Sequence, residues 1–156
     1  MYAWEMIQKE ILKINTNGMQ YLTNIEKLPH EHALQIAAYL WECCCTTDND
    51  FWYTIARGLL WNIPLHWIQH YTTQILQIMD VNWQDDFEYN NACVVFAHQP
   101  EILQILIDWG KQHSMTEDAT EWEKIGCQTK YFTQTMAEFE RLCDVYQIRF
   151  SFGCKK

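Results

Sequence analysis

The 156-residue chain is 49% hydrophobic and 15% aromatic, and its formal net charge is −9. This length suits one domain with a sizeable core, and the apolar content excludes an intrinsically disordered chain. Because proteins that grip phosphate backbones carry an excess of Lys and Arg, the acidic balance disfavours nucleic-acid binding. We therefore expect a single folded domain over residues 1–156.

The N-terminal residues and the longest apolar runs bear on where the protein works. Residues 1–5 lack the basic segment and apolar run of a secretory signal, which predicts a cytoplasmic protein. No run approaches the roughly eighteen apolar residues of a membrane-spanning helix. The seven cysteines form an odd set, with three adjacent at 43–45, so no disulfide framework follows and reduced thiols are expected. The role of this triplet stays open.

Helices are expected along most of the chain, because only five glycines and three prolines are available for turns. Apolar residues at helical spacing support this expectation. Examples are Leu103, Leu106 and Ile107 in one segment, and Ile68, Tyr71, Ile75 and Ile78 in another. The predicted helices cover residues 2–14, 18–27, 29–45, 50–61, 64–79, 85–97, 100–113, 118–126 and 130–147.

The three prolines indicate an internal repeat. Pro29, Pro64 and Pro100 lie 35 and 36 residues apart, a spacing typical of helical repeats. Proline is tolerated in the first turn of a helix, so each is predicted to open one. The pattern Asp-Phe-x-Tyr occurs at residues 50–53 and again at residues 86–89, which is also an offset of 36.

Acidic residues are expected at several helix starts, where they favour the helix dipole. Asp50, Asp85 and Glu121 each follow one of the three prolines by 21 positions. Asp85 with Glu88, and Asp118 with Glu121, also have the spacing of a capping box, in which side chains accept hydrogen bonds from free backbone N–H groups. For the adjacent carboxylates Asp85 and Asp86, capping is therefore a better explanation than acid–base catalysis.

Aromatic residues at helical spacing favour a packed helical core. Seven tryptophans are core or groove candidates, namely Trp41, Trp52, Trp61, Trp67, Trp83, Trp109 and Trp122. The predicted fold class is all-α, made of stacked antiparallel helix pairs that form either a HEAT-like α-solenoid or an irregular helical bundle with about eight or nine helices. The segment 149–154 alternates in character, and is expected either to be extended or to cap the last helix pair.

Catalytic and metal-binding motifs are weak. The chain has no Gly-rich phosphate loop, no Gly-x-Ser-x-Gly elbow and no His-Glu-x-x-His, so we expect no enzyme activity and no cofactor. His66 and His70 would share a helix face, and His30 and His32 flank Glu31. No Cys-x-x-Cys pair accompanies them, so partly exposed histidines are expected rather than a zinc site.

The chain has a general resemblance to two groups of proteins. The resemblance rests on the helices that begin at prolines, the repeated Asp-Phe-x-Tyr and the clustered acids, over roughly residues 28–125. The chain resembles short HEAT-like or armadillo-like arrays and, in size, acidity and aromatic content, the small α-helical immunity proteins of bacterial toxin systems such as contact-dependent growth inhibition. The resemblance implies a protein that binds a cognate toxin, commonly a nuclease, and blocks it. It assigns no functional residue.

The charge distribution suggests which surface such a partner would contact. Residues 81–126 contain nine acids against two lysines, and grouped carboxylates speed association with a cationic protein. Trp83, in a predicted turn beside this block, is a candidate aromatic anchor. The expected partner-binding residues are Asp85, Asp86, Glu88, Asp118, Glu121, Glu123 and Trp83. The alternatives are a solvated surface with no partner, and a helical adaptor for another protein; a monomer is favoured, but the oligomeric state, the toxin and the binding face stay open.

Overall fold

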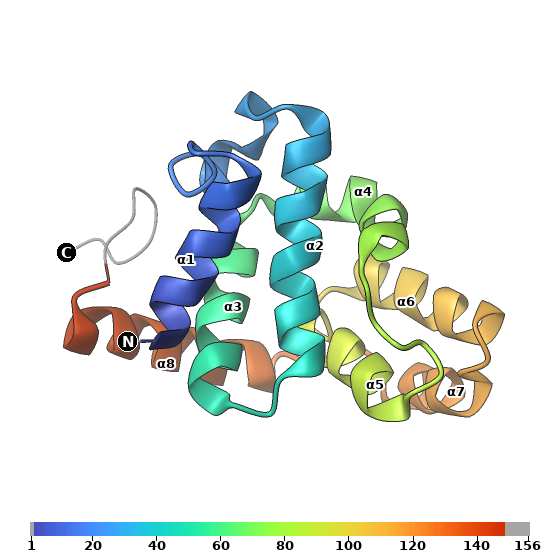
Figure 1. The fold of residues 1–156 in the computed structure, drawn as a ribbon. Helices are drawn as coiled ribbons and strands as arrows, with labels where there is room; N and C mark the ends of the chain where they lie inside the picture. The colour runs from blue at the N-terminus through green and yellow to red at the C-terminus, as the bar shows by residue number, and fades with distance from the viewer. Residues whose placement is uncertain (1, 149–156) are drawn as a thin grey trace.

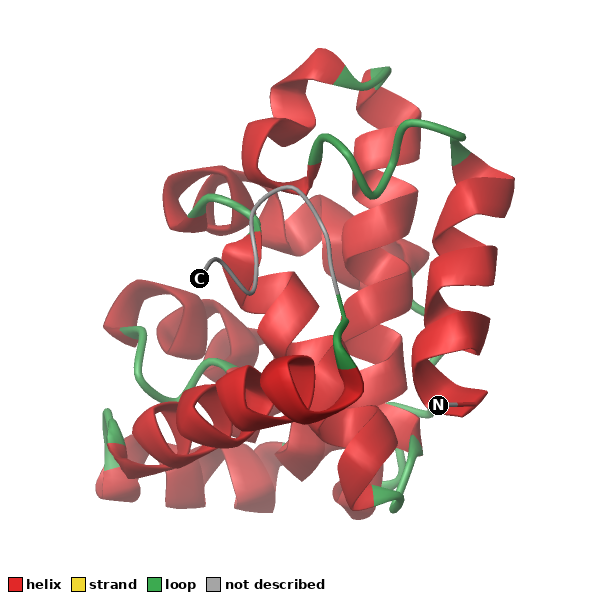
Figure 2. Cartoon of the chain, turned by 90° about the vertical axis from the view of Figure 1, so that its left-hand side faces the viewer, coloured by secondary structure: helices red, strands yellow, loops and turns green. Residues whose placement is uncertain are grey.

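The computed structural model describes residues 2–148, which form eight α-helices and one 3-10 helix joined by short loops (Figures 1 and 2). The elements are α1 (Tyr2–Ile14), η1 (Leu22–Lys27), α2 (His30–Thr46), α3 (Asp50–Asn62), α4 (Leu65–Ile78), α5 (Asp86–Val95), α6 (Pro100–Gln112), α7 (Thr116–Ile125) and α8 (Lys130–Tyr146). The predicted all-α class is confirmed. Within the described range, no helix is long and apolar enough to cross a membrane. The segment 149–154 lies outside the described residues.

The three prolines begin helices as predicted. Pro29 and Pro64 directly precede α2 and α4, and Pro100 is the first residue of α6. The predicted helix 18–27 is shorter in the structure, because turns follow α1 and only the 3-10 helix η1 forms. In this turn the side-chain oxygen of Asn15 accepts a hydrogen bond from the backbone N–H of Asn17 at 2.8 Å, a local bond that competes with helix continuation.

The helix starting at residue 116 differs from its prediction. Because α7 begins at Thr116, Glu121 lies in the middle of the helix and Asp118 in its first turn, so neither residue starts or caps it. The predicted Asp118–Glu121 capping box is therefore wrong. The apolar stripe on α4 also ends earlier than predicted, since Ile68 and Ile75 are buried whereas Ile78 is 43% exposed at the end of the helix.

The helix α2 runs through the middle of the molecule and packs against α1, α3, α4 and α5 (Figure 1). Its fully buried Trp41 stacks edge-on against Phe96 at 4.7 Å, and its indole N–H donates to the carbonyl of Ala92 at 3.4 Å. In a solenoid each repeat contacts only its neighbours. The contact between α3 and α8 joins helices that do not belong to adjacent pairs, so the irregular bundle is the better description of the two predicted arrangements.

The tryptophans and cysteines supply much of the core. Trp41, Trp67 and Trp122 are buried, whereas Trp52, Trp61, Trp83 and Trp109 are half-buried and pack against the core. Free thiols are found at Cys43, Cys44, Cys45, Cys93 and Cys127. Burial raises the pKa of the Cys44 and Cys45 thiols, which keeps them neutral in the core. The expectation of reduced thiols is wrong at Cys143, which is disulfide-bonded.

Arg57, which lies between α3 and α8, forms no ion pair with a carboxylate of residues 2–148. Arg57 is only 6% exposed, and its guanidinium carbon lies 3.6 Å from the centre of the Tyr53 ring. One guanidinium nitrogen donates to the Thr135 hydroxyl at 2.9 Å, while the buried Nε has no hydrogen-bond partner. The ring of Tyr53 thus provides a cation–π contact for a charge that pairs with no carboxylate in the described part of the chain.

The neighbouring His98 should make stability depend on pH. His98 stacks on Phe132 at 4.2 Å, and burial, followed by the positive charge of Arg57, lowers its pKa from 6.5 to about 4. The unfolded chain therefore binds a proton at a pH where the folded chain does not. Its contribution to stability is complete above pH 6.5 and is lost as the pH falls toward 4.

Because His98 is only half-buried, solvent screening reduces this effect, and we expect the histidine to account for about 1–2 kcal/mol of lost stability across that window. Urea unfolding of the wild type and of His98→Gln at a series of pH values would measure it, and the variant should show the shallower decline. His66→Gln, at an exposed histidine, is the matched control and should follow the wild type. Parallel curves for the wild type and His98→Gln would contradict the assignment.

Candidate functional site

An acidic hollow of about 790 Å³ lies where the first turns of α5 and α7 meet. Both helices lie at the same end of the molecule (Figure 1). The hollow is lined by Asn82, Gln84, Asp85, Asp86, Ser114, Met115, Thr116, Glu117 and Asp118. Four of these side chains are carboxylates, and none is Lys or Arg. This acidic hollow is the candidate functional site.

Local hydrogen bonds fix the α5 side of the hollow. Asp85 is the N-cap of α5, and its Oδ1 accepts the backbone N–H of Phe87 at 2.9 Å, as predicted. Just before it, the Asn82 side chain accepts the backbone N–H of Gln84 at 3.0 Å, and the carbonyl of Asn82 accepts the N–H of Asp85 at 3.0 Å. The short loop therefore has a defined shape that places Asp85 and Asp86 at the hollow.

The capping role of Asp85 can be separated from its charge. Asp85→Ala removes the cap and should lower the free energy of unfolding by about 1 kcal/mol. Asp85→Asn keeps a side-chain oxygen at the cap and should stay within about 0.5 kcal/mol of the wild type, because Asn and Asp cap helices about equally well. Urea denaturation followed by circular dichroism measures both values. Equal losses in the two variants would show that the negative charge, rather than the cap, stabilises α5.

Asn90 joins the two helices that form the hollow. Its side-chain nitrogen donates to the Asp86 carbonyl at 2.7 Å and to Asp118 Oδ1 at 3.2 Å. Its side-chain oxygen accepts the indole N–H of Trp122 at 2.8 Å. Ser114, on the α7 side, has a φ of 70°, a left-handed conformation that is uncommon for a residue with a side chain. Asp118 is therefore held in place by the opposite helix.

Three of the six predicted acids do not line the hollow. Glu88 instead accepts the backbone N–H of Asn82 at 2.5 Å. It also lies near Glu42, whose pKa is raised first by burial and then by the negative charges of Asp80 and Glu88. Glu88 thus completes the turn before α5. In a capping box it would instead accept the backbone N–H of the cap residue Asp85.

The other two acids belong to surface ion pairs. Glu123 pairs with Lys111 at 2.7 Å, which links α7 to α6. Glu121 lies 3.8 Å from Lys124 on the same helix. Both pairs are well exposed to solvent, so each is worth little stability. Their lysines offset part of the negative charge outside the hollow.

The predicted aromatic anchor packs partly against the core. Trp83 is half-buried, and its ring meets Tyr89 and Trp109 edge-on at 6.2 and 6.1 Å. Phe87, by contrast, is 50% exposed on the first turn of α5, between Asp86 and Glu88. In the sequence, Phe87 is marked only by the repeated Asp-Phe-x-Tyr motif.

Glu117 and Asn90 were not among the predicted site residues. Glu117 lies next to Asp118 in the acidic block and lines the hollow with it. Glu117 could have been predicted only because it directly precedes Asp118 in the sequence. No sequence pattern indicated a role for Asn90. Among residues 2–148, no group of three or more His, Cys, Asp or Glu side chains is placed to hold a metal ion.

Comparison with known proteins adds no relative to this description. No protein-family model matches the chain, and no curated protein or solved structure matches it either.

Proposed function

We propose that the chain is a small inhibitor of the immunity type, which binds a cationic toxin domain through the acidic hollow and blocks it. The observation that supports this most is the set of carboxylates at the hollow, Asp85, Asp86, Glu117 and Asp118, with no Lys or Arg in its lining. On this proposal the chain is a binding protein rather than an enzyme, and it acts in the cytoplasm, where the toxin would attack.

A concave acidic surface suits such a partner for two physical reasons. Grouped carboxylates attract a basic protein during its approach and raise the association rate. If the toxin is a nuclease, the same carboxylates would occupy the basic cleft that otherwise receives phosphates. Charged contacts alone rarely give tight binding, and the exposed ring of Phe87 beside Asp86 offers an apolar contact for the same partner.

The second candidate is a helical adaptor for a different protein partner. It is favoured by exposed apolar side chains on α8, away from the hollow. Tyr131, Val145 and Tyr146 are 46%, 58% and 50% exposed. A partner that covers α8 would not need the acidic hollow, so the two candidates differ in which surface becomes buried on binding.

Capture of the partner tests the proposal. The tagged chain would be co-expressed with the product of the reading frame next to its own, and the complex washed at low and at raised salt. We expect a one-to-one complex with a basic domain, slower association at raised salt, and rescue of cells from the toxicity of that partner. A salt-insensitive complex that buries α8 and rescues no cells would favour the adaptor instead.

A further inference from the structure

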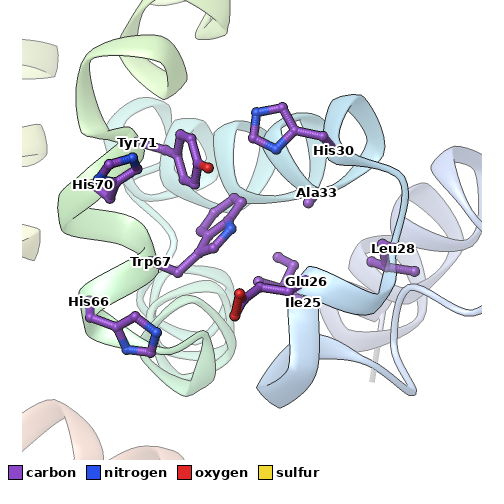
Figure 3. A pocket seen from close by; sticks show the side chains of 9 residues that line it. All are labelled: Ile25, Glu26, Leu28, His30, Ala33, His66, Trp67, His70 and Tyr71. Carbon is purple, nitrogen blue, oxygen red and sulfur yellow. The ribbon is translucent and has the colours of Figure 1, made fainter.

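A second pocket, of about 420 Å³, lies between η1, the start of α2 and the start of α4 (Figure 3). It is lined by Ile25, Glu26, Leu28, His30, Ala33, His66, Trp67, His70 and Tyr71. None of these residues lines the acidic hollow, and they come from different helices. The aromatic pocket, as we call it, is therefore a separate feature of the fold.

Part of the wall of the aromatic pocket is apolar and already in place. Ile25, Leu28 and Ala33 belong to the buried core and form its apolar lining. Trp67 is 5% exposed, and its ring lies 5.1 Å from that of Tyr71. A ligand with an apolar body could bury its surface here without first ordering the side chains.

Tyr71 connects the aromatic side chains around the pocket. Its ring meets His30 edge-on at 4.7 Å and His70 edge-on at 4.6 Å, in addition to its contact with Trp67. Figure 3 shows these rings grouped along one side of the pocket. Faces of Trp and Tyr carry negative electrostatic potential and attract cations. The aromatic wall therefore favours a positively charged group.

The negative charge at the rim of the pocket also favours a cationic ligand. Glu26 is the one lining residue with a carboxylate, and neither Lys nor Arg lines the pocket. Figure 3 shows the Glu26 side chain extending from η1 toward the Trp67 indole and His66 of α4. The nearby Lys27 directs its ammonium group over the Tyr21 ring, 5.8 Å from the ring centre. An anionic ligand would meet Glu26 with no lysine or arginine to offset the repulsion.

We propose that the aromatic pocket binds a small organic cation with an apolar body, such as an amine or amidine attached to a ring. The apolar body would rest on Leu28, with the buried Ile25 and Ala33 behind this wall, and the cationic group would lie between the Trp67 and Tyr71 rings and the Glu26 carboxylate. The pocket volume lies within the range of small-molecule sites and exceeds what a single side chain fills. This proposal does not depend on the toxin-binding role.

Benzamidine and benzamide test the charge requirement, because they have nearly the same shape and only benzamidine is a cation. With the full chain, isothermal titration calorimetry should give saturable benzamidine binding and at least about tenfold weaker benzamide binding. Nuclear magnetic resonance should show the Trp67 indole N–H signal shifting with benzamidine. Benzamide binding as tightly as benzamidine, or no benzamidine binding up to about 10 mM, would overturn the proposal.

Two variants locate the binding. Glu26→Gln removes the rim charge at an exposed position and should weaken benzamidine binding about three- to tenfold. Glu31→Gln changes the net charge equally at an exposed position outside the pocket, and should leave binding unchanged. Tyr71→Leu should weaken binding by a similar factor through loss of an aromatic face. Equal effects of Glu26→Gln and Glu31→Gln would place the binding elsewhere.

A peptide-like cation distinguishes a small ligand from a docked protein. Nα-acetyl-arginine-amide presents a guanidinium as it would appear on a protein chain. We expect it to bind no more tightly than benzamidine, because its narrow side chain leaves much of the pocket unfilled. Binding at least about tenfold tighter than benzamidine would overturn the small-molecule proposal in favour of an arginine from a protein partner.

Discussion

Neutralising the acidic hollow is expected to slow association with the captured basic partner by about tenfold or more at low salt. The triple variant Asp86→Asn, Glu117→Gln and Asp118→Asn removes three carboxylates while keeping the side-chain shapes. Asp85 is left intact because it caps α5, so the variant should fold as the wild type does. Surface-based association kinetics at several salt concentrations would measure the effect, and the salt dependence of the rate should become shallower.

A matched variant controls for net charge. Glu5→Gln, Glu31→Gln and Glu140→Gln also removes three carboxylates from exposed positions, none of which lines the hollow. It should reduce the association rate far less, because steering depends on where the charges lie as well as on their sum. Equal slowing in both triple variants would show that overall acidity, rather than the hollow, attracts the partner.

The helices could be predicted from the sequence because their start signals are local. Pro29, Pro64 and Pro100 mark the starts of three helices through the fixed geometry of one residue each, and the cap at Asp85 depends on a neighbour two positions away. The packing could not be derived in this way. The contact of α2 with α5 depends on side chains far apart in the chain, such as Trp41 and Phe96.

The candidate site was only partly predictable for the same reason. Asp85, Asp86 and Asp118 come together as the acidic block suggested, but Asn90 and Trp122 produce that arrangement through hydrogen bonds between α5 and α7. The spacing of Asp85 and Glu88 is compatible with two roles for Glu88: it could accept a hydrogen bond from the backbone N–H of Asp85, or from the turn that precedes the helix. The structure shows the second, because Glu88 accepts the backbone N–H of Asn82.

Histidines from two separate sequence patterns lie around one pocket in the structure. The pairs His66 with His70 and His30 with His32 were each considered alone in the sequence. In the structure His30, His66 and His70 line the aromatic pocket, while His32 lies 3.0 Å from the Asn15 side-chain nitrogen outside it. Their grouping depends on η1, α2 and α4 meeting, which no single pattern in the sequence indicates.

Gly58→Ala is expected to lower the free energy of unfolding by about 2–3 kcal/mol, although alanine is normally the better helix former. Gly58 lies in α3, and a Cβ atom added there would fall on the ring of Phe139 in α8. Phe139 is 2% exposed, so its ring has little room to move. Urea or thermal unfolding of the full chain would measure the change.

A double-mutant cycle tests whether the contact with Phe139 causes this loss. Phe139→Leu should itself destabilise the protein, because a buried ring is replaced by a smaller side chain. In that background Gly58→Ala should cost much less than in the wild type, since the clashing ring is gone, and the coupling should reach about 1–2 kcal/mol. Additive losses would mean that Gly58→Ala acts elsewhere. A stabilised single variant would show that α8 can move away from α3 at little cost, and that intrinsic helix propensity outweighs packing at this interface.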